Sequence, residues 1–412
     1  MTNSYVLSLI ALMTLAFGLE TLADLLNLTR LNDPLPSEFQ EIFDQPKYNR
    51  ALAYQKEKTY FGLIQGVLGF TFTLGFLFLG GFGILDRWVV SQGFNPGLNG
   101  IAYFAVLLGL KLILSLPFSL YDTFVLEEKY GFNRTTSGIF IGDLVKAVLL
   151  SVILGIPVYL GIAYFFEKAG VYGWLIAWFA FTLFQILLMY LAPAVIMPLF
   201  NKFTPLPESP AKDAILAYAK KQNFRLNGIY TMDSSKRSTK SNAFFTGFGK
   251  FRRLVLFDSL LEKHTPEELV SIFAHEVGHF KKKHILKSML LGLLPTALLF
   301  YAVGWVLGNE DLFNAFAMTG PSVYGGLIFV SLFFGPVSEF LGILTQFLSR
   351  KYEFEADEFS VATYGRPESM ISALKKLSAD NLSHLTPHPL KVLLEYTHPP
   401  ILERIRALKE RL

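Results

Sequence analysis

The sequence predicts a multi-pass α-helical membrane protein with about seven transmembrane helices and a smaller polar domain of helices and a few strands. Of the 412 residues, 52% are hydrophobic and only 17% are charged, whereas soluble domains carry roughly 25% charged residues. Several apolar runs approach the roughly 20 residues that a helix needs to cross a bilayer. The formal net charge of only +4 gives no sign of a nucleic-acid partner. Because the chain has no cysteine, any metal must be held by His, Asp or Glu.

Seven apolar segments are suitable for spanning a membrane. They cover residues 4–27, 61–85, 100–121, 144–166, 173–199, 285–308 and 322–348. The first segment lacks a basic flank and a clear cleavage site, so we interpret it as an uncleaved helix. Lys and Arg concentrate in every second connection, and the positive-inside rule therefore favours an amino terminus outside and a carboxyl terminus inside.

Two polar stretches lie on the inner, cytoplasmic face in this topology, where they can form one composite domain. We predict transmembrane helices 1–5 with their cytoplasmic loops in residues 1–200, the first part of the polar domain in 201–284, transmembrane helices 6–7 in 285–348 and its second part in 349–412. The first part is expected to contain a linker at 205–210, an amphipathic helix at 211–222, strands at 228–232, 242–248 and 252–257, and a polar loop at 233–241.

The sharpest chemical signal is the sequence HEVGH at residues 275–279, which matches HExxH. A helix is predicted independently, because Thr265 can cap it, Pro follows at the first helical position, and Glu268 stands three residues after the cap. On that helix His275 and His279 lie one turn apart on one face, where both can bind one Zn²⁺ ion. Glu276 then lies beside the metal as the general base for a zinc-bound water. Two solvent-facing histidines on an ordinary helix are the alternative.

A catalytic zinc site needs a third protein ligand, which here must be acidic. The segment SRKYEFEAD, residues 349–357, follows the seventh apolar segment on the inner side. Glu353 and Asp357 stand four residues apart, so one can bind zinc while the other orients a ligating imidazole. Spacing alone does not rank Glu353 against Glu355, and a solvated, charged helix end is the alternative.

Together with HEVGH, four further segments make the chain similar to the CAAX prenyl protease 1 family of membrane zinc metalloproteases. They are PFSLYDTFVLEEKYGFNRTT (117–136), SNAFFTGFGKFRRLVLFDSLL (241–261), SRKYEFEAD (349–357) and YTHPPILERI (396–405). The resemblance implies seven helices that enclose a water-filled chamber, with a gluzincin-like zinc domain of helices and a small sheet on the cytoplasmic face. It also implies one Zn²⁺ per chain with Glu353 as the third ligand, Asp357 as a supporting partner and Glu355 at a variable position.

The resemblance also gives roles to three residues that spacing alone leaves open. An extended peptide added beside the predicted strand at 242–248 would gain main-chain hydrogen bonds, and Asn242 would bond a substrate carbonyl; the alternative is an Asn that initiates a turn. His398 would stabilise the oxyanion, and Arg404 would hold Glu353 or Asp357, against a purely structural HPP turn. We expect the remaining histidines at the surface or at interfaces: His264, His284, His384 and His388.

The predicted function is peptide-bond hydrolysis by Glu-assisted attack of zinc-bound water. The resemblance implies removal of the C-terminal tripeptide from farnesylated CAAX proteins, and a broader role in membrane protein processing or quality control is compatible with it. The alternatives are an intramembrane site-2-type protease, which would place HExxH inside an apolar span, and a transporter with a structural metal site. Expected partners are a peptide or protein substrate, prenylated at its C-terminus or not, and the lipid bilayer, without nucleic acid. A bacterial inner membrane is favoured over the endoplasmic reticulum, because no dilysine signal ends the sequence.

Overall fold

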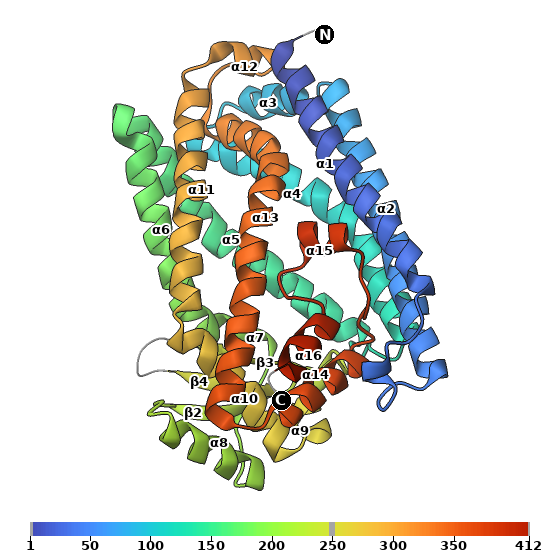
Figure 1. The fold of residues 1–412 in the computed structure, drawn as a ribbon. Coiled ribbons are helices and arrows are strands. Elements are labelled where there is room, and N and C mark those ends of the chain that lie inside the picture. The colour runs from blue at the N-terminus through green and yellow to red at the C-terminus, as the bar shows by residue number, and fades with distance from the viewer. Residues whose placement is uncertain (1–2, 247–251, 411–412) are drawn as a thin grey trace.

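The computed structural model describes residues 3–246 and 252–410. Within them, seven helices are long and apolar enough to cross a membrane, and they form an elongated bundle (Figure 1). The multi-pass helical architecture is thereby confirmed. The seven spans contain α1 (Ser4–Thr29), α2 (Gln45–Phe78), α4 (Pro96–Tyr121), α5 (Ser137–Lys168), α6 (Gly173–Leu191), α11 (His284–Leu307) and α13 (Val323–Tyr364).

The second span differs from its predicted bounds at both ends. Helix α2 begins at Gln45 instead of residue 61, because the Asp44 side chain accepts a hydrogen bond from the Lys47 backbone at 2.7 Å and caps a charged first half. It ends at Phe78, since Gly80 takes a left-handed conformation with φ +69° and the chain turns into the separate helix α3 (Gly81–Ser91). The predicted end at residue 85 was therefore wrong.

The helix of the seventh span does not stop where the predicted apolar segment ends, at residue 348. Helix α13 continues for 42 residues, from Val323 to Tyr364, with Pro336 in its apolar half, and Gly365 at φ +74° terminates it. The predicted membrane helix and the predicted ligand segment are therefore one continuous helix. Its lower half enters the polar domain in Figure 1.

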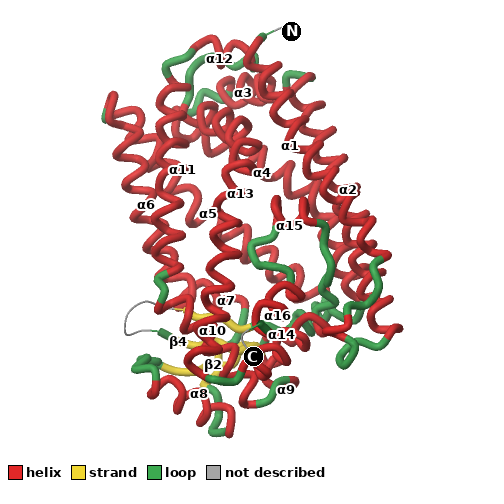
Figure 2. The backbone as a smooth tube through the Cα atoms, viewed as in Figure 1, coloured by secondary structure: helices red, strands yellow, loops and turns green. Residues whose placement is uncertain are grey.

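The polar domain contains a four-stranded mixed sheet, seen as the strands at one end of the molecule in Figure 2. The order is β1-β2-β4-β3, with β2 and β4 parallel and the other pairs antiparallel, so β3 forms an edge. The strands are β1 (Phe203–Pro205), β2 (Gly228–Met232), β3 (Ala243–Thr246) and β4 (Arg253–Phe257). The short β1 was not predicted and takes the first residue of the expected linker. Residues 247 and 248 of the predicted third strand lie outside the described residues.

The two sequence-distant parts of the polar domain share one hydrophobic core. Helices α8 (Pro210–Lys221) and α10 (Pro266–Lys281) contribute Ile215 and Phe273, the sheet contributes Leu254, and α14 (Pro367–Asp380) contributes Ala373. All four side chains are fully buried. The shared core therefore holds residues on both sides of the last two membrane spans in one unit.

Shorter elements complete the chain. They are α7 (Met197–Phe200), α9 (Asp258–Lys263), α12 (Glu310–Ala315), α15 (Pro389–Glu395), α16 (Ile401–Lys409), the π-helical turns Asp122–Glu127 and Ala192–Ile196, and the 3₁₀ turns Arg30–Asn32, Ser37–Phe39, Gly170–Tyr172 and Ser234–Lys236. The last of these lies in the predicted polar loop. Little of the second to fifth spans is buried, between 0 and 6% of their apolar windows, so these helices do not pack into a solid core.

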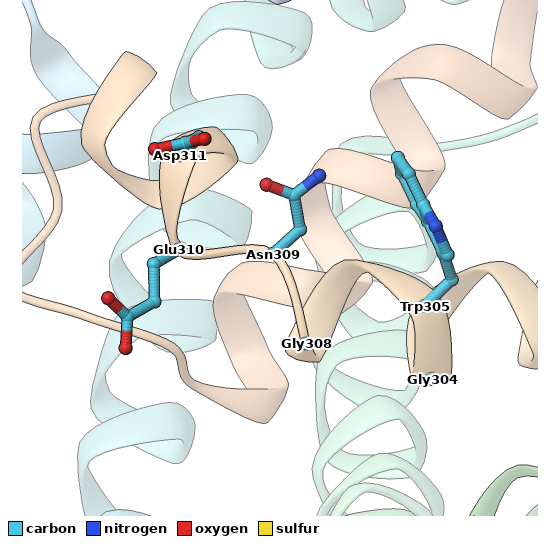
Figure 3. A pocket seen from close by; sticks show the side chains of 6 residues that line it. All are labelled: Gly304, Trp305, Gly308, Asn309, Glu310 and Asp311. Carbon is cyan, nitrogen blue, oxygen red and sulfur yellow. The ribbon is translucent and has the colours of Figure 1, made fainter.

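A pocket of about 600 Å³ lies beside α12, at the end of the bundle opposite the sheet in Figure 1, and Figure 3 shows its lining side chains from close by. Its lining includes Asn309, whose side chain accepts from the Leu312 backbone at 3.3 Å and donates to the Tyr5 hydroxyl at 2.9 Å. Glu310 and Asp311 stand in the first turn of α12, where acidic residues favour a helix. These contacts connect helix ends, so the pocket is explained by packing between helices. It contains none of the HEVGH residues.

Candidate active site

Helix α10 begins with the capping box that the sequence predicts. The Thr265 hydroxyl accepts from the Glu268 backbone at 3.3 Å, and the Glu268 carboxylate accepts from the Thr265 backbone at 2.9 Å. The same carboxylate binds Lys376 at 2.8 Å and Ser372 at 2.6 Å. The cap therefore also fastens α10 to α14.

Helix α10 crosses α13 at a close approach that Gly278 permits. A Cβ atom built at residue 278 would lie 3.0 Å from the Cα atom of Ala356 and 3.1 Å from the Cβ atom of Phe359. Real Cβ atoms rarely tolerate such contacts, so a larger residue would push the two helices apart. Gly278 therefore determines how closely His275 and His279 approach Glu353 on α13.

Three side chains from these two helices converge. The Nε2 atoms of His275 and His279 lie 3.1 Å apart, and the Glu353 carboxylate approaches them at 3.4 and 3.2 Å respectively. In a tetrahedral site with metal–ligand bonds of 2.0–2.1 Å, neighbouring ligand atoms lie roughly 3.3 Å apart. The two imidazoles and one carboxylate therefore fit a single metal ion of the size of zinc, and the residues named by motif and resemblance are those brought together.

Arg404 on α16 holds both acidic residues of α13. Its guanidinium donates two hydrogen bonds to Asp357, at 2.8 and 2.6 Å, and lies 3.2 Å from Glu353. Asp357 in turn lies 2.8 Å from Nδ1 of His275. Since Asp357 accepts from that Nδ1–H group, the Nε2 lone pair of His275 is free to face His279 and Glu353. Asp357 thus orients His275, and Arg404 orients Asp357.

The electrostatics of this cluster favour a positive charge at its centre. Burial lowers the pKa of His275, but the hydrogen bonds to Asp357 and Glu353 outweigh it and raise that pKa to about 9. Burial also lowers the pKa of Arg404, and Asp357 more than compensates, so the pKa is raised and the guanidinium stays charged. Carboxylates that stabilise a proton on His275 equally stabilise a bound cation.

Glu276 lies next to the convergence point and is partly exposed, unlike its neighbours His275 and Val277. Burial raises the pKa of its carboxyl group, and the nearby imidazoles of His275 and His279 oppose that rise. A carboxylate with a raised pKa accepts a proton from water more readily. Its accessibility and basicity both suit the predicted general base.

His398 is the exposed member of the cluster. Its Nε2 atom lies 3.4 Å from Glu353, its Nδ1 atom lies 2.9 Å from the Thr397 hydroxyl, and 64% of its side chain is exposed. Pro400 precedes α16 as its N-cap residue. The HPP turn therefore leads into the last helix and also carries His398 to the site, so the two alternatives are geometrically compatible.

Asn242 stands immediately before β3 and is exposed. Its side-chain oxygen accepts from the Ala243 backbone at 2.8 Å, and its backbone carbonyl accepts from Phe257 at 3.1 Å. These contacts match the turn-forming alternative, and a contact with substrate stays a prediction. Phe245 of β3 packs against Phe273 of α10, with ring centroids 5.5 Å apart, so this edge strand lies against the helix that carries HExxH.

Of the four histidines expected at the surface or at interfaces, three are buried and none of these three lies at the surface. His284 is only 2% exposed, and His264 and His384 are 7% exposed. His388 is partly exposed and caps α15 by accepting from the Leu390 backbone. His284 is buried because Lys283 takes a left-handed conformation with φ +58°, which ends the α10 segment and turns the chain into α11.

Sequence reasoning missed His284 as a neighbour of the site. Its Nδ1 atom lies 3.1 Å from Nδ1 of His279, and its Nε2 atom lies 3.1 Å from Glu355, which the resemblance placed at a variable position. The available signal was a third histidine five residues after HExxH, together with a second acidic residue two positions after Glu353.

Comparisons with known proteins agree with this geometry. Residues 24–202 match the family described as CAAX prenyl protease N-terminal, five membrane helices, and residues 205–412 match peptidase family M48. Similar curated proteins are the CAAX prenyl protease 1 homologs of Arabidopsis thaliana (34% identical, covering 97% of this chain and 96% of that protein) and Homo sapiens (33%, 91% and 88%). The crystal structure of S. mikatae Ste24p is similar over 99% of this chain and 100% of that one, with a TM-score of 0.94 and 27% identity.

Proposed function

The chain belongs to the CAAX prenyl protease 1 family of M48 membrane peptidases, and from that premise we propose that it is a zinc endopeptidase whose catalytic centre is formed by α10, α13 and α16. The observation that carries this proposal is the convergence of His275, His279 and Glu353 at 3.1–3.4 Å, with Glu276 beside them. Family membership establishes a membrane metallopeptidase; the choice of zinc and the residue roles are our proposal.

His275, His279 and Glu353 would hold the ion, because their donor set of two imidazoles and one carboxylate is typical of catalytic zinc. When bound, zinc supplies Lewis-acid chemistry that lowers the pKa of water and polarises a carbonyl. Asp357 and Arg404 keep His275 and Glu353 in the geometry that binding requires. The orientation of the proposed ligands is thus set by the protein's own side chains.

Glu276 is proposed as the group that moves protons. It takes a proton from the water that attacks the peptide carbonyl and passes it to the leaving amine, so it ends the cycle ionised as it began. We propose that His398, which is exposed and lies 3.4 Å from Glu353, donates a hydrogen bond to the oxyanion that develops on the carbonyl oxygen. Each group is thereby assigned one role in peptide hydrolysis.

We propose that a peptide binds as an additional strand along β3, which pairs with β4 on one side and forms the edge of the sheet among the described strands. Strand addition uses main-chain hydrogen bonds and tolerates varied side chains. The relatives named CAAX prenyl protease 1 suggest the substrate class, and we propose removal of the C-terminal tripeptide from farnesylated CAAX peptides. The interior bounded by the loosely packed spans, or the lipid around them, would take the prenyl chain.

Two alternatives are less well supported. A site-2-type protease would carry HExxH within a membrane helix, whereas α10 is a capped helix of the polar domain. A transporter with a structural metal site has no need for a partly exposed carboxylate, that of Glu276, directly beside the three converging side chains. From the distribution of Lys and Arg we propose that the polar domain faces the cytoplasm, and whether the membrane is bacterial or that of the endoplasmic reticulum stays a prediction.

The decisive experiment measures metal content and cleavage of a farnesylated CAAX peptide with the same purified protein. One zinc per chain, loss of zinc in His279→Ala and cleavage that a chelator abolishes are the expected results. Stoichiometric zinc retained in His279→Ala would remove that residue from the ligand set. Zinc-dependent cleavage of other peptides but not of the farnesylated one would overturn the proposed substrate class alone.

The orientation has its own test. A labelling tag inserted in residues 233–241 should react with a membrane-impermeant reagent from the cytoplasmic side, and a tag in residues 309–319 from the opposite side. Reversed labelling would contradict the orientation inferred from the positive-inside rule and leave the chemistry of the site untouched.

A further inference from the structure

The two histidines of HExxH, which we propose as metal ligands, have different hydrogen-bond partners at Nδ1. His275 donates from Nδ1 directly to a carboxylate, that of Asp357, at 2.8 Å. His279 instead faces a second imidazole, with its Nδ1 atom 3.1 Å from Nδ1 of His284, and the other ring nitrogen of His284 lies 3.1 Å from Glu355. We propose that His284 and Glu355 form a relay that positions His279 for metal binding.

The hydrogen-bond directions of this relay follow from the chemistry of imidazole. A neutral imidazole has one nitrogen that donates and one that accepts. If Nε2 of His279 offers its lone pair to the ion, its proton sits on Nδ1 and is donated to Nδ1 of His284. His284 then carries its own proton on Nε2 and donates it to Glu355. This assignment satisfies both contacts of His284 and leaves the metal-facing nitrogen of His279 unprotonated.

The reverse assignment fails at both ends. If Nδ1 of His284 donated to His279, the proton of His279 would sit on the nitrogen that faces Glu353, where it would exclude a metal ion. The Nε2 lone pair of neutral His284 would then face an ionised Glu355, which is repulsive. The negative charge of Glu355 therefore selects the tautomer of His284, which selects the tautomer of His279.

Packing fixes the relay in place. His284 is 2% exposed, and its ring stacks on Tyr352 with centroids 4.2 Å apart and planes 10° apart. Tyr352 and Glu355 flank Glu353 on α13, so the helix that carries the proposed acidic ligand also carries two of the three partners of His284. A shift of α13 relative to α10 would consequently disturb Glu353 and the orientation of His279 together.

This inference rests on the proposed metal site, and its test separates the two. Partners that orient a ligating His contribute about 10–100-fold in metal affinity. We would measure zinc affinity of the metal-stripped, detergent-purified full chain by competition with a chromogenic chelator. His284→Phe keeps a ring on Tyr352 but removes the acceptor, whereas His284→Asn keeps an oxygen near the position of Nδ1 but removes the stacked ring.

The relay predicts about a 10–100-fold loss of zinc affinity in His284→Phe and substantial retention in His284→Asn. The opposite ranking, or equal losses, would overturn it, because packing would then decide the effect. Glu355→Leu, at a side chain 25% exposed, should also weaken zinc binding even if His284→Phe does not fold. His388→Asn preserves a helix cap elsewhere and should bind zinc like the wild type. A wild type that binds no zinc would instead overturn the proposed function.

Discussion

Buried carboxylates at the two ends of the bundle have contrasting partners. At the end far from the sheet, Asp86 of α3 is fully buried and accepts three hydrogen bonds, from the backbone and hydroxyl of Thr319 at 2.6 and 2.7 Å and from the Tyr324 hydroxyl at 2.6 Å. All three donors are neutral groups. They satisfy the carboxylate and fasten α3 to the segment that leads into α13.

In the polar domain, Glu353 is 5% exposed, and its neighbours are ring nitrogens and a guanidinium. Two imidazoles approach it with the atoms that bind metals, and Arg404 is the adjacent charged donor. Two imidazole nitrogens and a carboxylate that converge on one point favour a bound cation there. Asp86 instead accepts hydrogen bonds from neutral donors, which satisfy it without a cation. The comparison teaches that the type of partner, rather than burial, separates a reactive carboxylate from a structural one.

The largest expected effect comes from removing the carboxylate that we propose as the general base. Glu276→Gln should lower kcat by roughly 10²–10⁴-fold, because the proposed general base is lost while the proposed metal ligands remain. Zinc content and thermal stability should stay at wild-type values, as measured by metal analysis and by unfolding in detergent. If the variant lost its zinc as well, Glu276 would belong to the ligand set and the assigned role would be wrong.

The Asp86 cluster should show the opposite pattern. Asp86→Ala leaves the buried hydroxyl of Tyr324 without its acceptor, which costs about 1–3 kcal/mol. It also removes the acceptor of two hydrogen bonds from the exposed Thr319, which contribute roughly 0.5–1.5 kcal/mol each. We expect a loss of about 2–5 kcal/mol in the free energy of unfolding, measured by thermal or denaturant unfolding in detergent. The fraction that stays folded should keep its wild-type kcat and zinc content. A reduced kcat with unchanged stability would contradict the division of roles between the two ends.

Local signals made parts of this architecture predictable. The capping box of Thr265 and Glu268 lies within four residues, and its two hydrogen bonds occur as predicted. The seven spans were predictable because bilayer thickness sets their length. Strand β2 was predicted at its observed bounds from its apolar pattern and the polar residues that flank it.

Features that depend on contacts between distant parts of the chain could not be predicted from the sequence. The burial of His284 depends on a left-handed Lys283 and on a ring from α13, 68 positions further along the chain. Helix α13 could not be predicted as one element, because its apolar half and its charged half suggest different environments although nothing breaks the helix between them. Spacing likewise left Glu353 and Glu355 unranked, and tertiary placement separates them: one faces the two ligating histidines and the other faces His284.

The smallest expected effect concerns how the substrate is held. Asp86 has hydrogen-bond donors from the protein on both carboxylate oxygens. Strand β3, in contrast, pairs with β4 on one side and forms the edge of the sheet among the described strands. An incoming peptide can therefore add main-chain hydrogen bonds along this edge. Asn242→Ala should lower kcat/KM by a few-fold to about tenfold with zinc intact, because one hydrogen bond contributes roughly 0.5–1.5 kcal/mol. The matched variant Asn242→Ser retains a side-chain oxygen for the turn at Ala243 but loses the amide donor, so it should be impaired to a similar degree.

The substrate side of the same contact gives the sharper measurement. Proline has no N–H group, so a proline or N-methyl residue should abolish cleavage wherever the peptide must donate to the edge strand, and should be tolerated at alternate positions where the N–H group points away. Steady-state kinetics on farnesylated peptides with such residues at successive positions around the scissile bond would reveal this two-residue period. If Asn242 bonds a substrate carbonyl, removing its amide should lower the rate for each permissive peptide by a similar factor. A profile without the period would mean that the peptide is not bound as an added strand, and the role proposed for Asn242 would then have no basis.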